Sequence, residues 1–225
     1  MRRNTTIGEL RWPETPEFVA VASQVKQNAV AIIIDALWSG YDLLVAEVLA
    51  RIDVNQADAE VERSITQLLE PRIREHLSSY LPFYVQHSVR ENESRRPPPA
   101  QAPEYDVAFV LRENPRVCWP VEAKVLRTDR TLAAYLADIR EQFLTCRYAP
   151  FSASGAMVGY LLKGDPHRAL GNIEAALAMP LINGPNSSPR PHKVSAHVRL
   201  VPEGKPYPAL FECHHLMMNM GVSVS

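Results

Sequence analysis

The 225-residue sequence predicts a single α/β domain in which helices flank a mixed β-sheet. Helical spacing of apolar residues dominates the first third of the chain, whereas short apolar segments typical of strands alternate with helical segments afterwards. Hydrophobic residues make up 46% of the chain and charged residues 22%, which is typical of a globular protein and excludes general disorder.

The first 56 residues are expected to form a helical extension. Apolar residues recur at helical spacing from Thr15 to about Ile52, and Ser39-Gly40 predicts a break or kink there. The most apolar part contains three acidic residues, which would be costly inside a bilayer. We therefore expect a buried helix rather than a membrane span.

A core from residue 57 to residue 225 is expected to follow this extension. Its first helix should run from Ala57 to about Tyr80, with a cap at Asp58 or just before it. Pro71 should kink or divide that helix.

The rest of the core alternates between predicted strands and helices. Strands are expected at residues 83–89, 105–111, 117–126, 155–162, 194–200 and 209–218. Helices are expected at residues 132–148 and 166–179, the second capped by Asp165 and started by Pro166. Pro120 predicts a bulge or an edge position for its strand.

Charge and cysteine content exclude several classes of protein. The formal net charge of −1 gives no overall attraction for nucleic acid. The three cysteines lie far apart without a C-x-x-C pair, which argues against a zinc site or a disulfide framework. The basic N-terminal residues lack the apolar segment of a signal peptide. We expect a soluble, cytoplasmic protein with reduced cysteines and no membrane partner.

Two acidic residues and a lysine lie on neighbouring predicted strands. Asp106 is on the first strand of a hairpin, and Glu122 and Lys124 are near the end of the second. Residues two apart in a strand point to the same face, and hairpin pairing can bring Asp106 onto that face as well. Two carboxylates beside a lysine suit a hard divalent cation such as Mg²⁺ or Mn²⁺, which takes oxygen ligands. Such an ion polarises a phosphoryl oxygen and activates water, while Lys124 holds the water or compensates developing charge.

A cross-strand salt bridge on an exposed sheet face is the alternative explanation of these three residues. Both carboxylates are embedded in apolar segments, where a merely solvated ion pair is unusual. The sequence therefore favours a functional site.

The segments YDVAFVL and VCWPVEAK resemble the PD-(D/E)XK, or restriction-endonuclease-like, nuclease superfamily. That superfamily carries an acidic residue on one hairpin strand and E-x-K on the next, which correspond to Asp106, Glu122 and Lys124. Tyr105 stands where the family name has a proline. The resemblance covers the order of elements over residues 57–162, and it is specific at three or four residues. It implies a restriction-endonuclease-like central mixed sheet with flanking helices, to which the N-terminal helical segment is added.

Further site residues are implied by this resemblance. The backbone carbonyl of Ala123 would complete a metal site formed by Asp106 and Glu122. A glutamate on the helix before the hairpin would assist, for which Glu62 is the best match and Glu60 the fallback; a solvent-facing helix charge is the alternative for Glu62. The helix after the E-x-K strand would bind substrate phosphate, and its candidates, which otherwise pack or cap, are Gln142, Arg147 and Tyr148.

The implied activity is Mg²⁺- or Mn²⁺-dependent hydrolysis of DNA phosphodiester bonds in restriction, repair or anti-phage defence, with RNA as the other substrate left open. The chain would work as a homo-oligomer or with partner subunits. The alternative function is a catalytically silent nuclease-fold subunit that binds nucleic acid or scaffolds a larger complex.

Histidines on the predicted strands invite a metal-binding interpretation. His197 with Arg199, and His214-His215, are more often hydrogen-bonded structural residues at such positions, and the resemblance requires no histidine ligand. We assign none of them to a metal, although His197 and Arg199 alternate onto one face and could line the groove.

Overall fold

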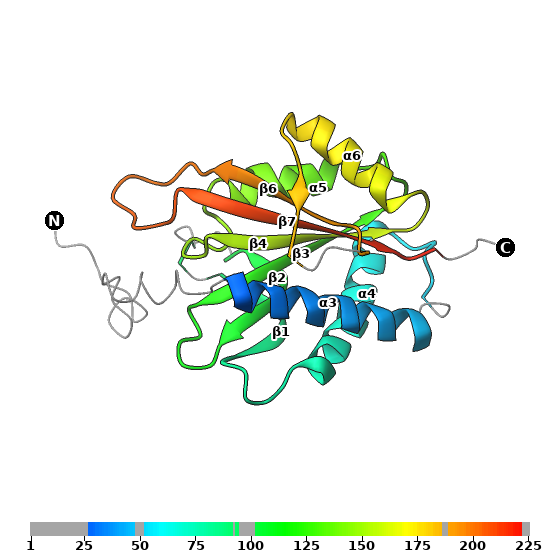
Figure 1. Cartoon of the computed structure of the whole chain (residues 1–225), viewed down its shortest axis with the longest axis horizontal. Helices are drawn as coiled ribbons and strands as arrows, with labels where there is room; N and C mark the ends of the chain where they lie inside the picture. The colour runs from blue at the N-terminus through cyan, green and yellow to red at the C-terminus, as the bar shows by residue number, and fades with distance from the viewer. Residues whose placement is uncertain (1–26, 48–51, 92, 95–101, 186–188, 222–225) are drawn as a thin grey trace.

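Seven strands form one mixed sheet at the centre of the computed structural model, which describes residues 27–47, 52–91, 93–94, 102–185 and 189–221 (Figure 1). The strands are β1 (Phe83–Arg90), β2 (Glu104–Leu111), β3 (Cys118–Leu126), β4 (Ser154–Leu161), β5 (Ile182–Asn183), β6 (His192–Val198) and β7 (Leu210–Asn219). Their order is β1-β2-β3-β4-β7-β6-β5, and β4 runs parallel to both β3 and β7, whereas the other pairs are antiparallel. The predicted α/β class with a mixed sheet is confirmed.

Helices cover both faces of the sheet (Figure 1). They are α3 (Gln27–Glu47), α4 (Asp58–His76), α5 (Ala133–Asp138) with a continuing π-helical turn η2 (Ile139–Phe143), and α6 (Pro166–Leu177). α3 and α4 share one hydrophobic cluster with one face of the sheet, and α5, η2 and α6 share a second cluster with the opposite face. Burial of these two apolar layers is the main source of the fold's stability.

α3 is part of the core, as expected from its acidic residues. It is long and apolar enough over residues 29–47 to resemble a membrane span. However, Ile33, Ile34 and Leu37 are fully buried in the cluster that α3 shares with α4 and the sheet. The predicted helix before Gln27 and over residues 48–51 lies outside the described residues, and Ile52 is not helical.

Gly40 and Pro71 both lie inside continuous helices, so neither residue breaks its helix in two, which was one of the two predicted alternatives. A Cβ atom at Gly40 would lie 2.7 Å from Ile73 Cγ1 and 2.9 Å from the Ile73 backbone nitrogen, so glycine allows α3 to approach α4 closely. Packing between the two helices therefore overrides the low helix propensity of Gly40. The cap of α4 is Ala57, which makes no side-chain hydrogen bond, and Asp58 follows it in the first turn.

The predicted hairpin of β2 and β3 forms with a short antiparallel ladder. Its pairs run from Val110↔Cys118 to Val107↔Val121. Beyond that point β2 continues to pair with β1, whereas β3 pairs with β4 from Val121↔Ala156 onward. The two strands of the hairpin therefore separate beyond Val107 of β2 and Val121 of β3.

Pro120 lies in an interior strand, so the predicted edge position is wrong. It pairs with Ala108 of β2, and the ladder to β4 starts one residue later, at Val121. The missing N–H of proline therefore interrupts no hydrogen bond of the β3–β4 ladder.

The remaining strands begin and end within two residues of their predicted bounds, and the helices are shorter than predicted. Asp165 caps α6 by accepting a hydrogen bond from the Arg168 backbone N–H at 2.8 Å, and Pro166 starts the helix. The predicted helix over residues 132–148 ends at Phe143. The two-residue strand β5 was not predicted.

Candidate functional site

The site lies where β2 and β3 separate. The ladder of the hairpin ends at the pair Val107↔Val121. The next residue beyond this pair is Asp106 on β2 and Glu122 on β3. The pairing of β1 with β2 also omits Asp106 and the opposite residue Ser88, whose φ of 55° is left-handed. Such irregular pairing redirects side chains and often accompanies functional sites.

Lys124 lies at the centre of this site. Its Nζ donates hydrogen bonds to Glu122 Oε1 at 2.9 Å, to the Ala123 carbonyl at 2.8 Å and to Glu62 Oε1 at 3.2 Å. Asp138 Oδ2 lies 3.1 Å from the same nitrogen, at ion-pair distance but outside hydrogen-bond geometry. We call Lys124 with Glu62, Asp106, Glu122 and Asp138 the Lys124 cluster.

Asp106 is held in place by the backbone of the E-x-K strand. Its Oδ2 accepts a hydrogen bond from the Ala123 N–H at 2.8 Å. Glu62 is fixed in a similar way, because its Oε2 accepts from the Val125 N–H at 3.2 Å. Glu60, the fallback, is exposed and pairs with Arg63, so Glu62 is the glutamate that α4 brings to the cluster. The structure thus places all five residues of the predicted metal and catalytic set, Glu62, Asp106, Glu122, Ala123 and Lys124, side by side.

Burial makes negative charge expensive in the cluster. It raises the pKa of Glu62 and of Asp106, in each case against the opposing attraction of Lys124. Burial raises the pKa of Glu122 well above its ordinary value, and the neighbouring charge of Asp106 raises it further. For Lys124, burial lowers the pKa, but the surrounding carboxylates, with Glu122 first, outweigh burial and raise it. Four carboxylates therefore share one ammonium in a largely water-excluded position.

The chemistry of the cluster suits a hard divalent cation, because every donor is an oxygen and negative charge exceeds positive charge. Glu122 is 6% exposed, and its Oε2 has no hydrogen-bond partner among the described residues. In that part of the chain, no three His, Cys, Asp or Glu side chains are already arranged to hold a metal ion. The Lys124 ammonium lies among the oxygens instead, on Glu122 Oε1 and the Ala123 carbonyl.

Asp138 was not predicted from the sequence. It is the last residue of α5 and is contributed by the helix that follows the E-x-K strand. No local pattern marks Asp138, because its carboxylate reaches Lys124 only through the way α5 packs against the sheet.

The three predicted phosphate-binding residues differ in their surroundings. Burial raises the pKa of the Tyr148 hydroxyl, and the nearby charges of Glu122 and Asp138 raise it further, so Tyr148 lies beside the cluster. Its hydroxyl donates to the Glu104 carbonyl at 3.0 Å. Gln142 has a buried side-chain oxygen without a hydrogen-bond partner in the described part of the chain. Arg147 instead lines a surface pocket that also includes Lys205, so it is not joined to the cluster.

A buried Arg199 fixes the segment that carries these residues. Its guanidinium donates to four backbone carbonyls, those of Phe143, Tyr148, Ala149 and Ser152, at 2.9–3.0 Å. Arg199 also lies 4.1 Å from the ring centre of Phe211. The expectation that Arg199 lines an open groove is therefore wrong, because the side chain is 4% exposed and fully used by the fold.

The buried histidines form hydrogen-bonded pairs within β6 and β7. His192 Nε2 lies 3.0 Å from His214 Nδ1, and the Ser195 hydroxyl bridges His197 and His215 at 2.6 and 2.7 Å. Like Arg199, His197 is buried, at 6% exposure, and does not line a groove. These residues have the structural role that the sequence favoured.

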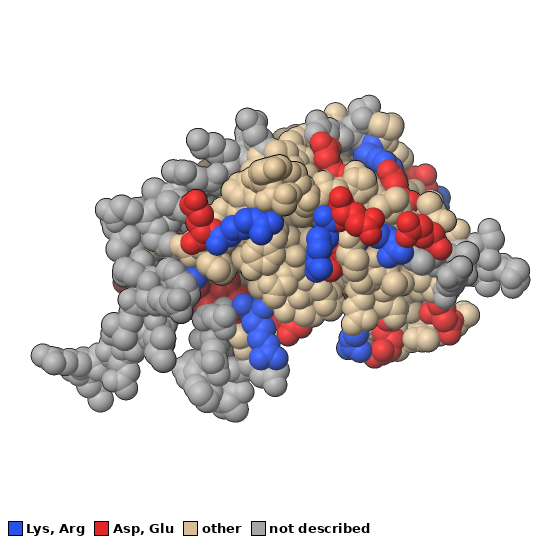
Figure 2. Space-filling view, turned by 90° about the horizontal axis from the view of Figure 1, so that it is seen from below, with Lys and Arg blue, Asp and Glu red and all other residues tan. Residues whose placement is uncertain are grey.

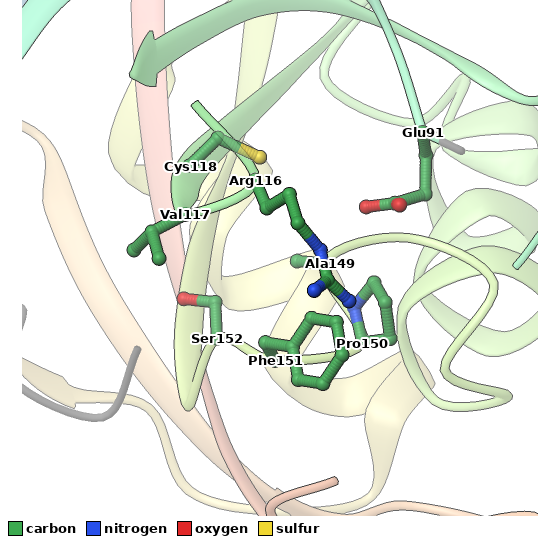
Figure 3. Close-up of a pocket in the computed structure, with 8 residues that line it drawn as sticks. All are labelled: Glu91, Arg116, Val117, Cys118, Ala149, Pro150, Phe151 and Ser152. Carbon is green, nitrogen blue, oxygen red and sulfur yellow. The ribbon is translucent and has the colours of Figure 1, made fainter. Parts of the chain in front are cut away.

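A small pocket near the start of β2 includes Glu91 and Ala149, which hold Tyr105, the residue before Asp106. Figure 3 shows the Glu91 carboxylate pointing toward the Arg116 guanidinium, which lies 5.3 Å from the ring centre of Phe151. The Tyr105 hydroxyl donates to Glu91 and accepts from the Ala149 N–H. Burial raises the pKa of Glu91 to about 7. The contacts of Tyr105 thus fix the backbone next to Asp106.

Surface charge on the side covered by α4 is mixed. Figure 2 shows Lys and Arg side chains lying beside Asp and Glu rather than in one continuous basic area of the described surface. Two of the ion pairs lie within α4, Arg63–Glu60 and Arg74–Glu70, and a third, Arg72–Glu47, joins α4 to α3. Long-range attraction of a polyanion is therefore weak on this side.

Comparison of the chain with models of protein families, with curated proteins and with solved structures finds no match. The functional argument consequently rests on the residues of the Lys124 cluster.

Proposed function

We propose that this chain is a nuclease that hydrolyses DNA phosphodiester bonds with Mg²⁺ or Mn²⁺. The observation that carries the proposal is the Lys124 cluster, in which an ammonium and four carboxylates converge at the opening of the β2–β3 hairpin. The order α4, β1, β2, β3, α5, β4 agrees with the restriction-endonuclease-like arrangement that the resemblance implies.

Each residue has a distinct role in this proposal. Asp106 and Glu122 supply carboxylate oxygens for the cation, the Ala123 carbonyl adds a backbone oxygen, and Glu62 assists from α4. A bound Mg²⁺ supplies a Lewis acid that polarises the phosphoryl oxygen and makes water more acidic. Lys124 orients the attacking water and compensates the negative charge that develops on the phosphate. Tyr148 and Gln142 contact the substrate phosphate from the segment that Arg199 holds, with Arg147 further along it.

Charged groups buried at this density are better explained by function than by stability. A buried ion pair rarely stabilises a fold more than packed apolar side chains of similar volume. Perturbed pKa values of carboxylates that share a pocket with a lysine are typical of active sites. The proposed setting is the cytoplasm, in restriction, repair or anti-phage defence, as an oligomer or with partner subunits.

Cleavage of supercoiled plasmid tests this proposal. Purified protein is incubated with plasmid and Mg²⁺ or Mn²⁺, beside Asp106→Asn, Lys124→Met and Glu62→Gln. Glu60→Gln is the matched control, because Glu60 lies on the same helix but is exposed and pairs with Arg63. We expect nicked or linear products with the parent and with Glu60→Gln, and a loss of at least about 100-fold with Asp106→Asn and Lys124→Met. Equal cleavage by the parent and Asp106→Asn would refute the assignment of the site.

A silent nuclease-fold subunit is the second candidate, favoured by the complete engagement of Lys124 in ion pairs with Glu62, Glu122 and Asp138. In that case no variant changes plasmid binding and none of the proteins cleaves. A fluorescent DNA duplex of 30 base pairs, titrated in the same buffers, measures that binding.

A further inference from the structure

The position of the Lys124 ammonium has a consequence for how a cation enters the site. Nζ contacts Glu122 Oε1, the Ala123 carbonyl and Glu62 Oε1, which are oxygens of the proposed metal ligands. A divalent ion on the same oxygens would lie within a few ångströms of a protonated amine. Like charges at that distance repel strongly in a buried position, so the two cations exclude each other.

Asp138 extends the same set of oxygens. Asp138 is the last residue of α5, which packs on the face of the sheet opposite to α4, the helix that carries Glu62. Its Oδ2 lies 3.1 Å from Lys124 Nζ without a hydrogen bond. An independent observation shows that the set is incomplete as it stands. Glu122 is 94% buried, faces the charges of Asp106 and Asp138, and its Oε2 lacks a hydrogen-bond partner among the described residues. A buried carboxylate oxygen without a partner is costly unless a cation or a donor reaches it.

We propose that Asp138 is a further cation-ligating carboxylate of this site, and that the Lys124 ammonium holds the place of the divalent ion, which binds only by displacing it. This inference rests on the proposed metal site and deepens it. Nζ and a divalent ion compete for one set of oxygens, so the affinity for the ion is reduced by the stability of the Lys124 ion pairs. Displacement also frees the Lys124 side chain to act on the substrate, because it leaves Glu122 and the Ala123 carbonyl.

Titration calorimetry with Mn²⁺ in the absence of nucleic acid tests both parts. Asp138→Asn should weaken Mn²⁺ binding about 10–100-fold, as expected for the loss of a group that shapes a metal site. Lys124→Met should strengthen binding at least about tenfold, because the competing ammonium is gone. The matched control is Glu141→Gln, since Glu141 is an exposed carboxylate in the turn that follows Asp138. It should leave the affinity unchanged.

A second comparison covers the case in which Lys124→Met does not fold. The double variant Lys124→Met/Glu62→Gln removes one positive and one negative charge, and it is compared with Glu62→Gln alone. It should bind Mn²⁺ at least about tenfold more tightly than the single variant. Circular dichroism spectra establish folding of each protein before titration.

The outcomes separate this inference from the nuclease proposal. Equal Mn²⁺ affinity of the parent and Asp138→Asn overturns the role of Asp138, and unchanged or weaker binding after loss of Lys124 overturns the competition. Absence of Mn²⁺ binding by the parent up to millimolar concentration overturns both. The expected pattern of affinities without any plasmid cleavage leaves the inference standing and refutes the nuclease. Plasmid cleavage by the parent, together with equal Mn²⁺ affinities of the parent and the variants, refutes this inference and supports the nuclease.

Discussion

Arg199 is expected to be one of the largest single contributors to stability outside the hydrophobic clusters. Its guanidinium donates four hydrogen bonds of 2.9–3.0 Å to backbone carbonyls of residues 143–152, and it is 4% exposed. No carboxylate faces it in the described part of the chain, and burial lowers its pKa to about 10. Arg199→Met would remove the charge and leave those carbonyls buried without donors.

The expected loss follows from these contacts. Hydrogen bonds from a charged donor contribute about 1.5 kcal/mol each at the low end, so four give about 6 kcal/mol. The contact with Phe211 adds about 1 kcal/mol. The substitution also removes the cost of burying the unpaired Arg199 charge, which offsets about 3 kcal/mol of the lost stability. We therefore expect the free energy of unfolding to fall by about 4 kcal/mol, and the melting temperature to fall by about 10 °C for a chain of this size.

Urea denaturation followed by circular dichroism at pH 7 measures this change. Arg140→Met is the control, because Arg140 is exposed and, within the described residues, donates one hydrogen bond, to the Ala176 carbonyl at 3.0 Å. That variant should remain within about 0.5 kcal/mol of the parent. A decrease of less than about 1 kcal/mol for Arg199→Met would refute the view that Arg199 holds residues 143–152 in place.

Two further predictions concern helix packing and pH. Gly40→Ala should destabilise the fold by about 2 kcal/mol in urea denaturation, because its Cβ would lie 2.7 Å from Ile73 Cγ1. Gly171→Ala, with open space around it in α6, should stabilise it by up to about 1 kcal/mol, and the opposite order would contradict the packing argument. Burial, with a smaller effect of His192, lowers the pKa of His214 to about 3, so the folded protein binds this proton less readily than the unfolded chain. The associated stability is present above pH 6.5 and is lost as the pH falls toward the folded pKa, at about 1.4 kcal/mol per unit. His192 and His215 also have lowered pKa values, so urea denaturation of His214→Gln between pH 4 and 7 should show a slope that is smaller by about this amount but not zero. Equal slopes for both proteins would show that His214 is not buried in its neutral form.

The sequence was informative wherever local pattern and tertiary structure agree. Asp106 and Glu122 stand out because they interrupt apolar segments, and the two-residue repeat of a strand places Glu122 and Lys124 together. Glu62 could be preferred over Glu60 from the face of α4 on which it lies. The expected mixed sheet followed from the alternation of strands and helices.

Other features depend on contacts between distant elements, which a local pattern does not contain. Gly40 looked like a helix breaker, but the close packing of α3 on α4 requires a glycine there and α3 stays continuous. Pro120 sits in an interior strand because the ladder to β4 begins just after it. Asp138 escaped notice because only the crossing of α5 over β3 brings its carboxylate to Lys124. Arg199 was expected at a groove because the local pattern does not contain its partners. Its four carbonyl partners come from a segment about 50 residues earlier in the chain.

A crystal structure of the protein soaked in Mn²⁺, with anomalous scattering recorded at the manganese edge, locates the cation without reference to any activity. We expect one anomalous peak bounded by Asp106, Glu122, Asp138 and the Ala123 carbonyl. Lys124 Nζ should then have moved away from Glu122 Oε1, where it lies 2.9 Å away in the present structure. A map without a peak there, and with Lys124 still bound to Glu122, would contradict the proposed metal site.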